Sequence, residues 1–151
     1  MTETVYRGRP LAIITMYRPI KAEGPTRVHT QAINKIRAKG LQNEPINVTK
    51  FLYEELEQLV GRFRENGGSI VVGGDFNEED RPTSHMTEAM GRMGLVNAIR
   101  RTDLTTSETR KQGKKTIDHI WVSPDLMPEI VGSGYGRYYE GLVSDHRGCF
   151  I

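Results

Sequence analysis

Apolar and polar residues alternate along the chain in blocks that predict strands and helices in turn. The apolar runs of residues 11–17, 69–74 and 116–123 are short and end at proline, glycine or polar residues, which is typical of buried strands. Apolar residues recur at helical spacing over residues 48–66 and 84–92, with charged residues on the other face. The order of these blocks predicts a mixed α/β layered fold.

Weaker patterns fill the segments between these blocks. Residues 30–39 favour a short helix that ends at Gly40, and residues 95–99 form a short apolar segment. Residues 106–115 are polar and basic, which predicts a loop, and residues 144–151 suggest a last strand. No repeat or linker divides the chain, so we expect one domain over residues 1–151.

Composition narrows the class of protein. The chain has 36% hydrophobic and 26% charged residues, which indicates a globular domain, and its net charge of +2 does not by itself argue for nucleic-acid binding. Cys149 is the single cysteine, so an internal disulfide is excluded and a reducing compartment is favoured. No membrane-spanning run or signal-peptide h-region is present, and we expect an intracellular protein, nuclear or cytoplasmic.

The stretch "IVVGGDFNEED", residues 70–80, places polar side chains where a buried strand ends. Residues alternate along an extended segment, so Asp75 and Asn77 are expected on one side and Phe76 on the other. Carboxylate and amide oxygens suit Mg²⁺ or Mn²⁺ and can hold a water molecule. The alternative is a surface turn closed by Asx hydrogen bonds.

Two later segments carry further acids at strand ends or edges, namely "TIDHIWVS" with Asp118 and "VSDHRG" with Asp145 and His146. A carboxylate inside an apolar strand needs a partner, and Asp118 could fix the tautomer of His146. His119 should point to the opposite face and have a structural role. The alternative for Asp145 and His146 is a solvated corner.

In this order, "GGDFNEE", "TIDHIWVS" and "SDHRG" resemble the endonuclease/exonuclease/phosphatase superfamily, which includes pancreatic deoxyribonuclease and the apurinic/apyrimidinic endonucleases. The resemblance extends from "IITMYRP" to the end of the chain. "YRP" and "GYGRYYEGLVSDHRGCFI" are also similar to the retroelement-encoded branch. The resemblance implies a four-layered α/β sandwich of the DNase I-like type.

It also implies a role for each matching residue. Asp75 would polarise or deprotonate the attacking water, and Asn77 would hold the phosphate or the metal. Asp145 would bind the divalent cation, Mg²⁺ or Mn²⁺, with Asp75 and Asn77 as further ligands. His146, oriented by Asp118, would hydrogen-bond a phosphoryl oxygen during in-line displacement.

Tyr17 falls where the family places a side chain that contacts the phosphate. Its alternative is a strand-end tyrosine with its hydroxyl in solvent. The chain departs from the family in length, because members are built from two similar halves and the first half supplies an Asn and a metal-binding Glu. Only about ten residues precede the predicted first strand, and Glu3 matches nothing. We therefore expect the C-terminal portion of the domain, with one metal ligand missing and an exposed sheet face that could self-associate.

The leading hypothesis for function is a divalent-metal-dependent phosphodiesterase that acts as an endonuclease on DNA, of retroelement or repair type. Four basic residues could bind backbone phosphates, unless their segment is only a solvated loop: Arg110, Lys111, Lys114 and Lys115. One alternative is hydrolysis of small phosphate esters such as phosphoinositides or sphingolipid head groups, because fold and chemistry are shared. Another is a catalytically silent, truncated remnant of the domain.

Overall fold

The computed structural model describes residues 1–22, 24–40, 45–99, 108–138 and 144–151. A five-stranded sheet has the strand order β1-β2-β3-β5-β4, and a small second sheet pairs β6 with β7. The strands are β1 (Thr2–Tyr6), β2 (Arg9–Tyr17), β3 (Ser69–Asp75), β4 (Val96–Asn97), β5 (Asp118–Val122), β6 (Gly134–Tyr135) and β7 (Cys149–Phe150). The helices are α1 (Val28–Ala38), α2 (Val48–Glu65), α3 (His85–Arg92) and the 3₁₀ helix η1 (Pro124–Glu129).

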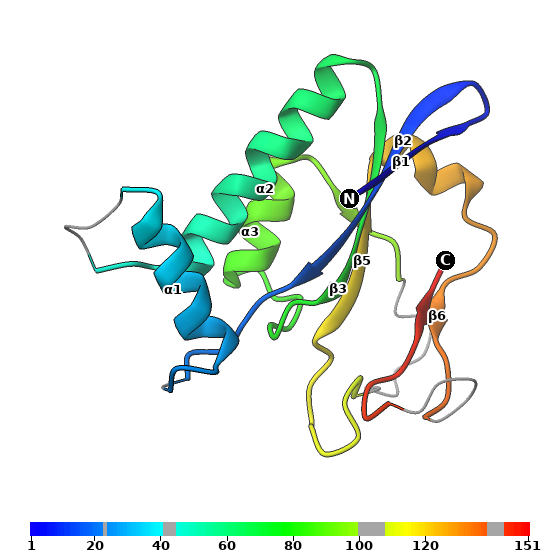
Figure 1. The fold of residues 1–151 in the computed structure, drawn as a ribbon. Helices are drawn as coiled ribbons and strands as arrows, with labels where there is room; N and C mark the ends of the chain where they lie inside the picture. The colour runs from blue at the N-terminus through cyan, green and yellow to red at the C-terminus, as the bar shows by residue number, and fades with distance from the viewer. Residues whose placement is uncertain (23, 41–44, 100–107, 139–143) are drawn as a thin grey trace.

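The helices and the small sheet lie on opposite sides of the main sheet. Strands β2 and β3 are parallel and are joined through α1 and α2, whereas β5 runs antiparallel to β3. Figure 1 shows α2 and α3 against one face of the sheet, with η1 and β6 on the other side. The carboxyl ends of β2 and β3 and the amino end of β5 therefore lie at one end of the sheet, because parallel neighbours end together and an antiparallel one begins there.

The main core lies between the helices and the sheet. It contains alternate residues of β2 and β3 together with Trp121 and side chains of α2 and α3: Ala12, Ile14, Met16, Ile70, Val72, Tyr53, Leu56, Val60, Met86 and Met90. On the other face, Ile120 and Val122 pack against η1, β6 and β7. Ile13 and Tyr17 of β2 stay 44% and 50% exposed on that face. An open sheet face is thus present, while self-association through it stays a prediction.

Most of the predicted elements form, and capping explains where two helices begin. Asn47 Oδ1 accepts a hydrogen bond from the Lys50 amide at 3.0 Å at the start of α2, and Ser84 Oγ accepts from the Thr87 amide at 3.0 Å at the start of α3. The first helix was predicted to begin at Thr30, and in the structure α1 begins two residues earlier, at Val28. The predicted mixed α/β layering is confirmed.

Two sequence predictions about the ends of the chain need correction. The amino-terminal residues, expected to be a polar tail, form β1 because Arg7 and Gly8 have φ of 49° and 79°, the geometry of a two-residue hairpin turn. Of the last strand predicted over residues 144–151, only Cys149–Phe150 is a strand. Residues 106 and 107 of the predicted loop lie outside the described residues. Among the helices that the structure describes, none has the length and apolarity needed to cross a membrane.

Candidate active site

Three polar side chains lie in a row across neighbouring strands at one end of the sheet. Tyr17 of β2 pairs with Asp75 of β3, and Asp75 pairs with Asp118 of β5. Residues directly opposite one another share a face of the sheet, so all three lie on the face away from the α-helices. His119 points to the helix face, where it is buried and its Nε2 lies 2.9 Å from the Glu78 carbonyl oxygen. Its predicted structural role is confirmed.

A glycine that tolerates no side chain brings Asp75 to the end of β3. Gly74 has φ of 148°, and a Cβ placed on it would lie 1.9 Å from the Met16 carbonyl oxygen. Only glycine lets β2 and β3 stay paired at this point. Asp75 itself is partly buried, and this desolvation raises the pKa of its carboxyl, with the Asp118 charge adding to the rise and the Asn77 backbone hydrogen bond opposing it. Asp75 is therefore a stronger base than an ordinary aspartate.

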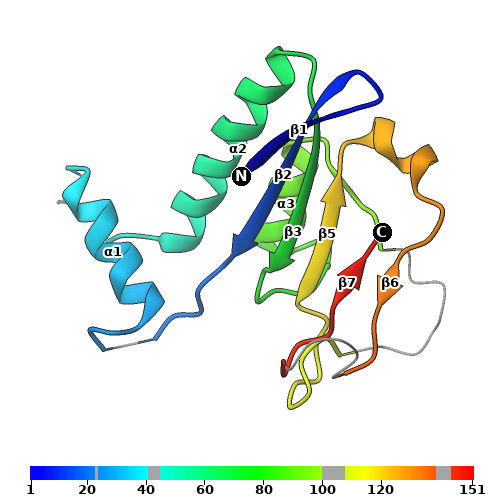
Figure 2. The same cartoon turned by 45° about the vertical axis from the view of Figure 1, so that its right-hand side comes forward.

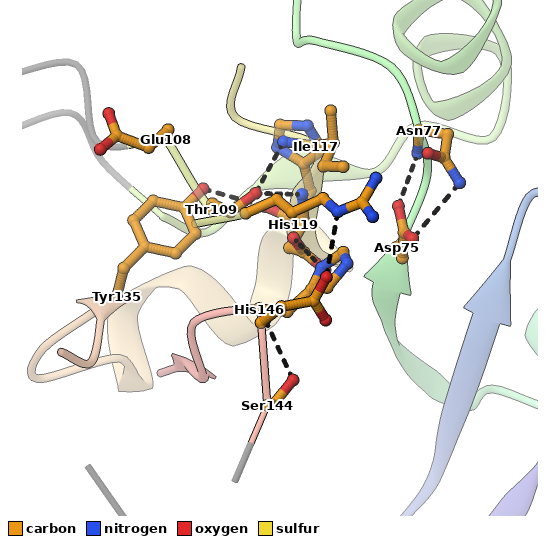
Figure 3. A network of polar contacts seen from close by, with 12 residues as sticks. Asp75, Asn77, Glu108, Thr109, Ile117, His119, Tyr135, Ser144 and His146 are labelled. Atoms are coloured by element: carbon orange, nitrogen blue, oxygen red, sulfur yellow. Dashed lines mark hydrogen bonds and ion pairs between the residues drawn. The ribbon is translucent and has the colours of Figure 1, made fainter. Parts of the chain in front are cut away.

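Asn77 reaches Asp75 through a turn, and strand alternation, the predicted reason, is wrong. Strand β3 ends at Asp75, and Asn77 has φ of 49°, in the left-handed region. Its backbone N–H donates to Asp75 Oδ1 at 2.9 Å, and its Nδ2 donates to Asp75 Oδ2 at 3.3 Å and to the Arg18 carbonyl oxygen at 2.8 Å (Figure 3). The Asx turn offered as the alternative is thus also the means that places both side chains together. Asn77 Nδ2 donates both of these side-chain hydrogen bonds. The amide oxygen is the atom of this side chain that can accept a hydrogen bond from a ligand.

Arg18 holds this turn, and sequence reasoning missed it. Its Nε donates to the Phe76 carbonyl oxygen at 2.5 Å and its Nη2 donates to the Asn77 carbonyl oxygen at 2.6 Å. Its backbone N–H donates to the Asp75 carbonyl oxygen at 2.9 Å. The side chain is only 14% exposed. The only sequence signal was the "YRP" segment, which drew attention to Tyr17 and not to the residue after it.

Asp118 and His146 form the second half of the site. His146 Nδ1 lies 2.9 Å and 3.2 Å from the two carboxylate oxygens of Asp118, so Nδ1–H donates to that carboxylate. Asp118 is buried, whereas the side chain of His146 is 27% exposed. This pairing fixes the ring orientation and leaves Nε2 as the nitrogen that can meet a substrate. Asp118 pairs with Asp75 across β3 and β5, so His146 lies at the same end of the sheet as Asp75.

Thr109 connects the two segments that supply this pair, and it too was missed. It is fully buried, and its Oγ1 accepts hydrogen bonds from the amides of Ile117 at 2.9 Å and Asp118 at 3.2 Å. Its carbonyl oxygen accepts from the Arg147 amide at 2.8 Å. A single residue thus holds the start of β5 through its side chain and the segment that carries His146 through its backbone carbonyl. A threonine within a predicted loop gives no sequence signal for such a role.

Asp145 lies beside this pair but is engaged elsewhere. Its Oδ2 is 3.1 Å from Arg110 Nε, and this hydrogen bond lowers the pKa of its carboxyl. Among the described residues, no three acidic, histidine or cysteine side chains lie close enough together to hold a metal ion. The assignment of Asp75, Asn77 and Asp145 as metal ligands stays a prediction.

The predicted nucleic-acid contacts lie in the loop before β5. Arg110, Lys111, Lys114 and Lys115 are all exposed, and Arg110 pairs with Asp145. Residues Arg110 and His146 also form an isolated antiparallel bridge. The loop is therefore attached directly to the segment that carries the imidazole.

Comparison with known proteins agrees with this geometry. The model of the Endonuclease/Exonuclease/phosphatase family matches residues 7–146, a span that contains Tyr17, Asp75, Asp118 and His146. No curated protein matches the chain. The match covers nearly the whole length of 151 residues. With its mixed sheet and helices, the chain therefore belongs to the endonuclease/exonuclease/phosphatase family and has an α/β fold of the DNase I-like kind.

Proposed function

We propose that the chain hydrolyses phosphodiester bonds in DNA, as an endonuclease of retroelement or repair type. The observation that carries this proposal is the row in which Asp75 stands directly opposite Asp118, which in turn holds His146 at 2.9 Å. A basic carboxylate beside an oriented imidazole can serve both needs of attack at phosphorus. One group accepts the proton of the water, and the other donates to the oxygens that gain charge.

Asp75 is the group that accepts the proton of the attacking water. Its raised pKa favours proton transfer, because a general base works best when its pKa approaches the working pH. Asn77 assists through its amide oxygen, which can accept the second hydrogen bond of the same water. The turn bonds at 2.9 Å and 3.3 Å keep the two side chains in register.

His146 stabilises the negative charge that develops on the phosphoryl oxygens. Its Nδ1–H is bound to Asp118, so Nε2 faces the substrate and donates to a phosphoryl oxygen when the ring is protonated. Tyr17, opposite Asp75 and half exposed, can direct its hydroxyl to the same phosphate.

The family is generally dependent on divalent metal ions, and Mg²⁺ or Mn²⁺ is the cofactor that we propose. Asp75, Asn77 and Asp145 offer the oxygen atoms that these cations prefer. Among the described residues, no three acidic, histidine or cysteine side chains lie close enough together to hold a metal ion, and the amide of Asn77 is outside that count. No step of the mechanism above is therefore assigned to a metal ion.

The basic residues beside this edge favour a polymer over a small phosphate ester. The four basic residues of the loop before β5 can bind phosphates on either side of the scissile bond.

Nicking of supercoiled plasmid tests the proposal, with Mg²⁺, Mn²⁺ or EDTA present and with Asp75→Ala beside the parent chain. Glu65→Ala is the matched control, because Glu65 is an exposed acid at the end of α2. We expect metal-dependent nicking by the parent and by Glu65→Ala, and none by Asp75→Ala. Absence of nicking by a folded parent chain would refute the proposal, and hydrolysis of phosphoinositides without nicking would replace it with the small-ester alternative.

A further inference from the structure

The positive charge of the chain is concentrated in one segment outside the site. Residues 24–40, which contain α1, include four basic residues and no acidic residue: Arg27, Lys35, Arg37 and Lys39. The net charge of the whole chain is only +2, so the remainder is net negative. A surface that binds a polyanion needs a local excess of positive charge. The segment of α1 has such an excess, although the protein as a whole is nearly neutral.

The arrangement of α1 keeps most of this charge available. Ile36 is buried, and Lys39 joins α1 to α2 because its Nζ lies 3.3 Å from Glu55 Oε1 and 5.2 Å from the centre of the Phe51 ring. Arg27, Lys35 and Arg37 are exposed. None of these three forms a salt bridge within the part of the chain that the structure describes.

The outward face of α1 also carries neutral hydrogen-bonding side chains. Gln31 and Asn34 are exposed and lie four and seven residues after Arg27, which places them on the same side of the helix. Val28 is the single large apolar side chain that is exposed on α1, at 50%. A face with cations and amides and little apolar surface fits the phosphates and grooves of a nucleic acid better than a lipid bilayer, which needs buried apolar area.

The position of α1 extends the surface of the candidate site. In Figures 1 and 2, α1 lies beside the end of the sheet at which β2 and β3 end, and the loop before β5 lies on the other side of that end. Tyr17 and Asp75 are at this end of the sheet. A duplex that crosses the row of site residues can therefore meet the basic loop on one side and α1 on the other.

We propose that α1 is a second contact surface for duplex DNA, which grips the backbone next to the site through Arg27, Lys35 and Arg37. The inference rests on the proposed function, because it concerns how the same substrate is held. Contacts of this kind bind phosphates without reading sequence, and they release condensed counterions. They act on affinity and not on the chemical step.

Fluorescence anisotropy of a labelled DNA duplex tests the inference, with the triple variant Arg27→Gln/Lys35→Gln/Arg37→Gln. The control Arg9→Gln/Arg62→Gln/Arg92→Gln removes the same charge from β2, α2 and α3. We expect the α1 variant to lose at least about tenfold in affinity near physiological salt and to lower the slope of log K against log salt by about 2–3. The control should stay close to the parent. Circular dichroism checks that all three proteins fold.

Equal affinities, equal losses in both variants, or no binding of DNA by the parent would overturn the inference. So would a loss of binding to phosphatidylserine vesicles without a loss of DNA affinity. Hydrolysis of bis(4-nitrophenyl) phosphate is measured separately and should be the same for parent and α1 variant. If no protein hydrolyses it while the affinity difference persists, the proposed function fails and the α1 surface stands. If all hydrolyse it and the affinities do not differ, only the α1 surface fails.

Discussion

Removal of the Arg18 guanidinium should loosen the turn that carries Asp75 and Asn77. Arg18→Met keeps an apolar stem of similar length but loses the donors to the Phe76 and Asn77 carbonyl oxygens, at 2.5 Å and 2.6 Å. Arg18→Lys keeps the charge, yet one ammonium group cannot reproduce the planar fork that meets two carbonyls. The pair of variants separates charge from geometry.

The magnitude follows from these contacts. A hydrogen bond from a charged donor contributes about 1.5–3 kcal/mol, and the bond to Thr49 Oγ1 at 3.4 Å is too long to add much. The side chain is mostly buried, so water replaces the two strong bonds only in part. We expect Arg18→Met to lower the free energy of unfolding by about 2–4 kcal/mol, and Arg18→Lys by about half as much.

Urea unfolding followed by the fluorescence of Trp121 measures this change, since Trp121 is the single tryptophan and is buried in β5. Arg92→Met is the control, because its ion pair with Glu57 is exposed and such pairs contribute about 0–1 kcal/mol. A loss for Arg18→Met as small as that of Arg92→Met would refute the reasoning. Nicking at the parent's rate by Arg18→Met would show that the turn does not need this clamp for activity.

Three further predictions concern the other supports of the site. Thr109→Val leaves two buried amides without their acceptor and should cost about 2–4 kcal/mol in urea unfolding, whereas Thr109→Ser keeps the acceptor and should lose less. Asp75→Asn should raise the free energy of unfolding at neutral pH, measured in EDTA, and should abolish nicking, measured in Mg²⁺. The raised pKa means that the folded parent binds the proton more tightly, so its stability falls as pH rises from the usual carboxyl range of about 4 through the folded pKa, and the gain should vanish below that range. A lower stability of Asp75→Asn at neutral pH would mean that the Asn77 bonds outweigh burial. Asp118→Asn removes the carboxylate partner of His146 and should slow single-turnover cleavage by about 10²–10⁴, with DNA affinity unchanged. A rate within about threefold of the parent would remove Asp118 from the mechanism.

Sequence patterns predicted the helices, the three central strands and the acids at their ends. These features depend on hydrophobic periodicity and on strand alternation, and both can be read from the order of apolar and polar residues along the chain. The row of Tyr17, Asp75 and Asp118 follows once β2, β3 and β5 are neighbours, because their registers match. The assignment of metal ligands, by contrast, came from resemblance, and the described residues do not gather three metal-binding side chains.

The features that were missed share a physical cause, which is that their partners are backbone atoms. Arg18 binds carbonyl oxygens of a turn, and Thr109 binds amides at the start of β5. Every residue offers a carbonyl, so no residue type marks the partner in advance. Strand β1 was missed for a related reason, because the positive φ of Arg7 and Gly8, and not the polarity of residues 2–6, decides the hairpin.

The two halves of the site are supported independently and meet at the sheet. Arg18 and Gly74 fix the end of β3 with Asp75, while Thr109 fixes β5 with Asp118 and the segment of His146. The two halves are joined where the Phe76 amide donates to the Ile117 carbonyl oxygen at 2.9 Å and where Asp75 pairs with Asp118, so the pairing of β3 with β5 sets one half against the other. Sheet pairing is rigid compared with loop contacts, because neighbouring ladder bonds hold each pair in register. The distance between Asp75 and Asp118 is therefore a property of the sheet, whereas the imidazole of His146 reaches Asp118 from a segment outside the strands.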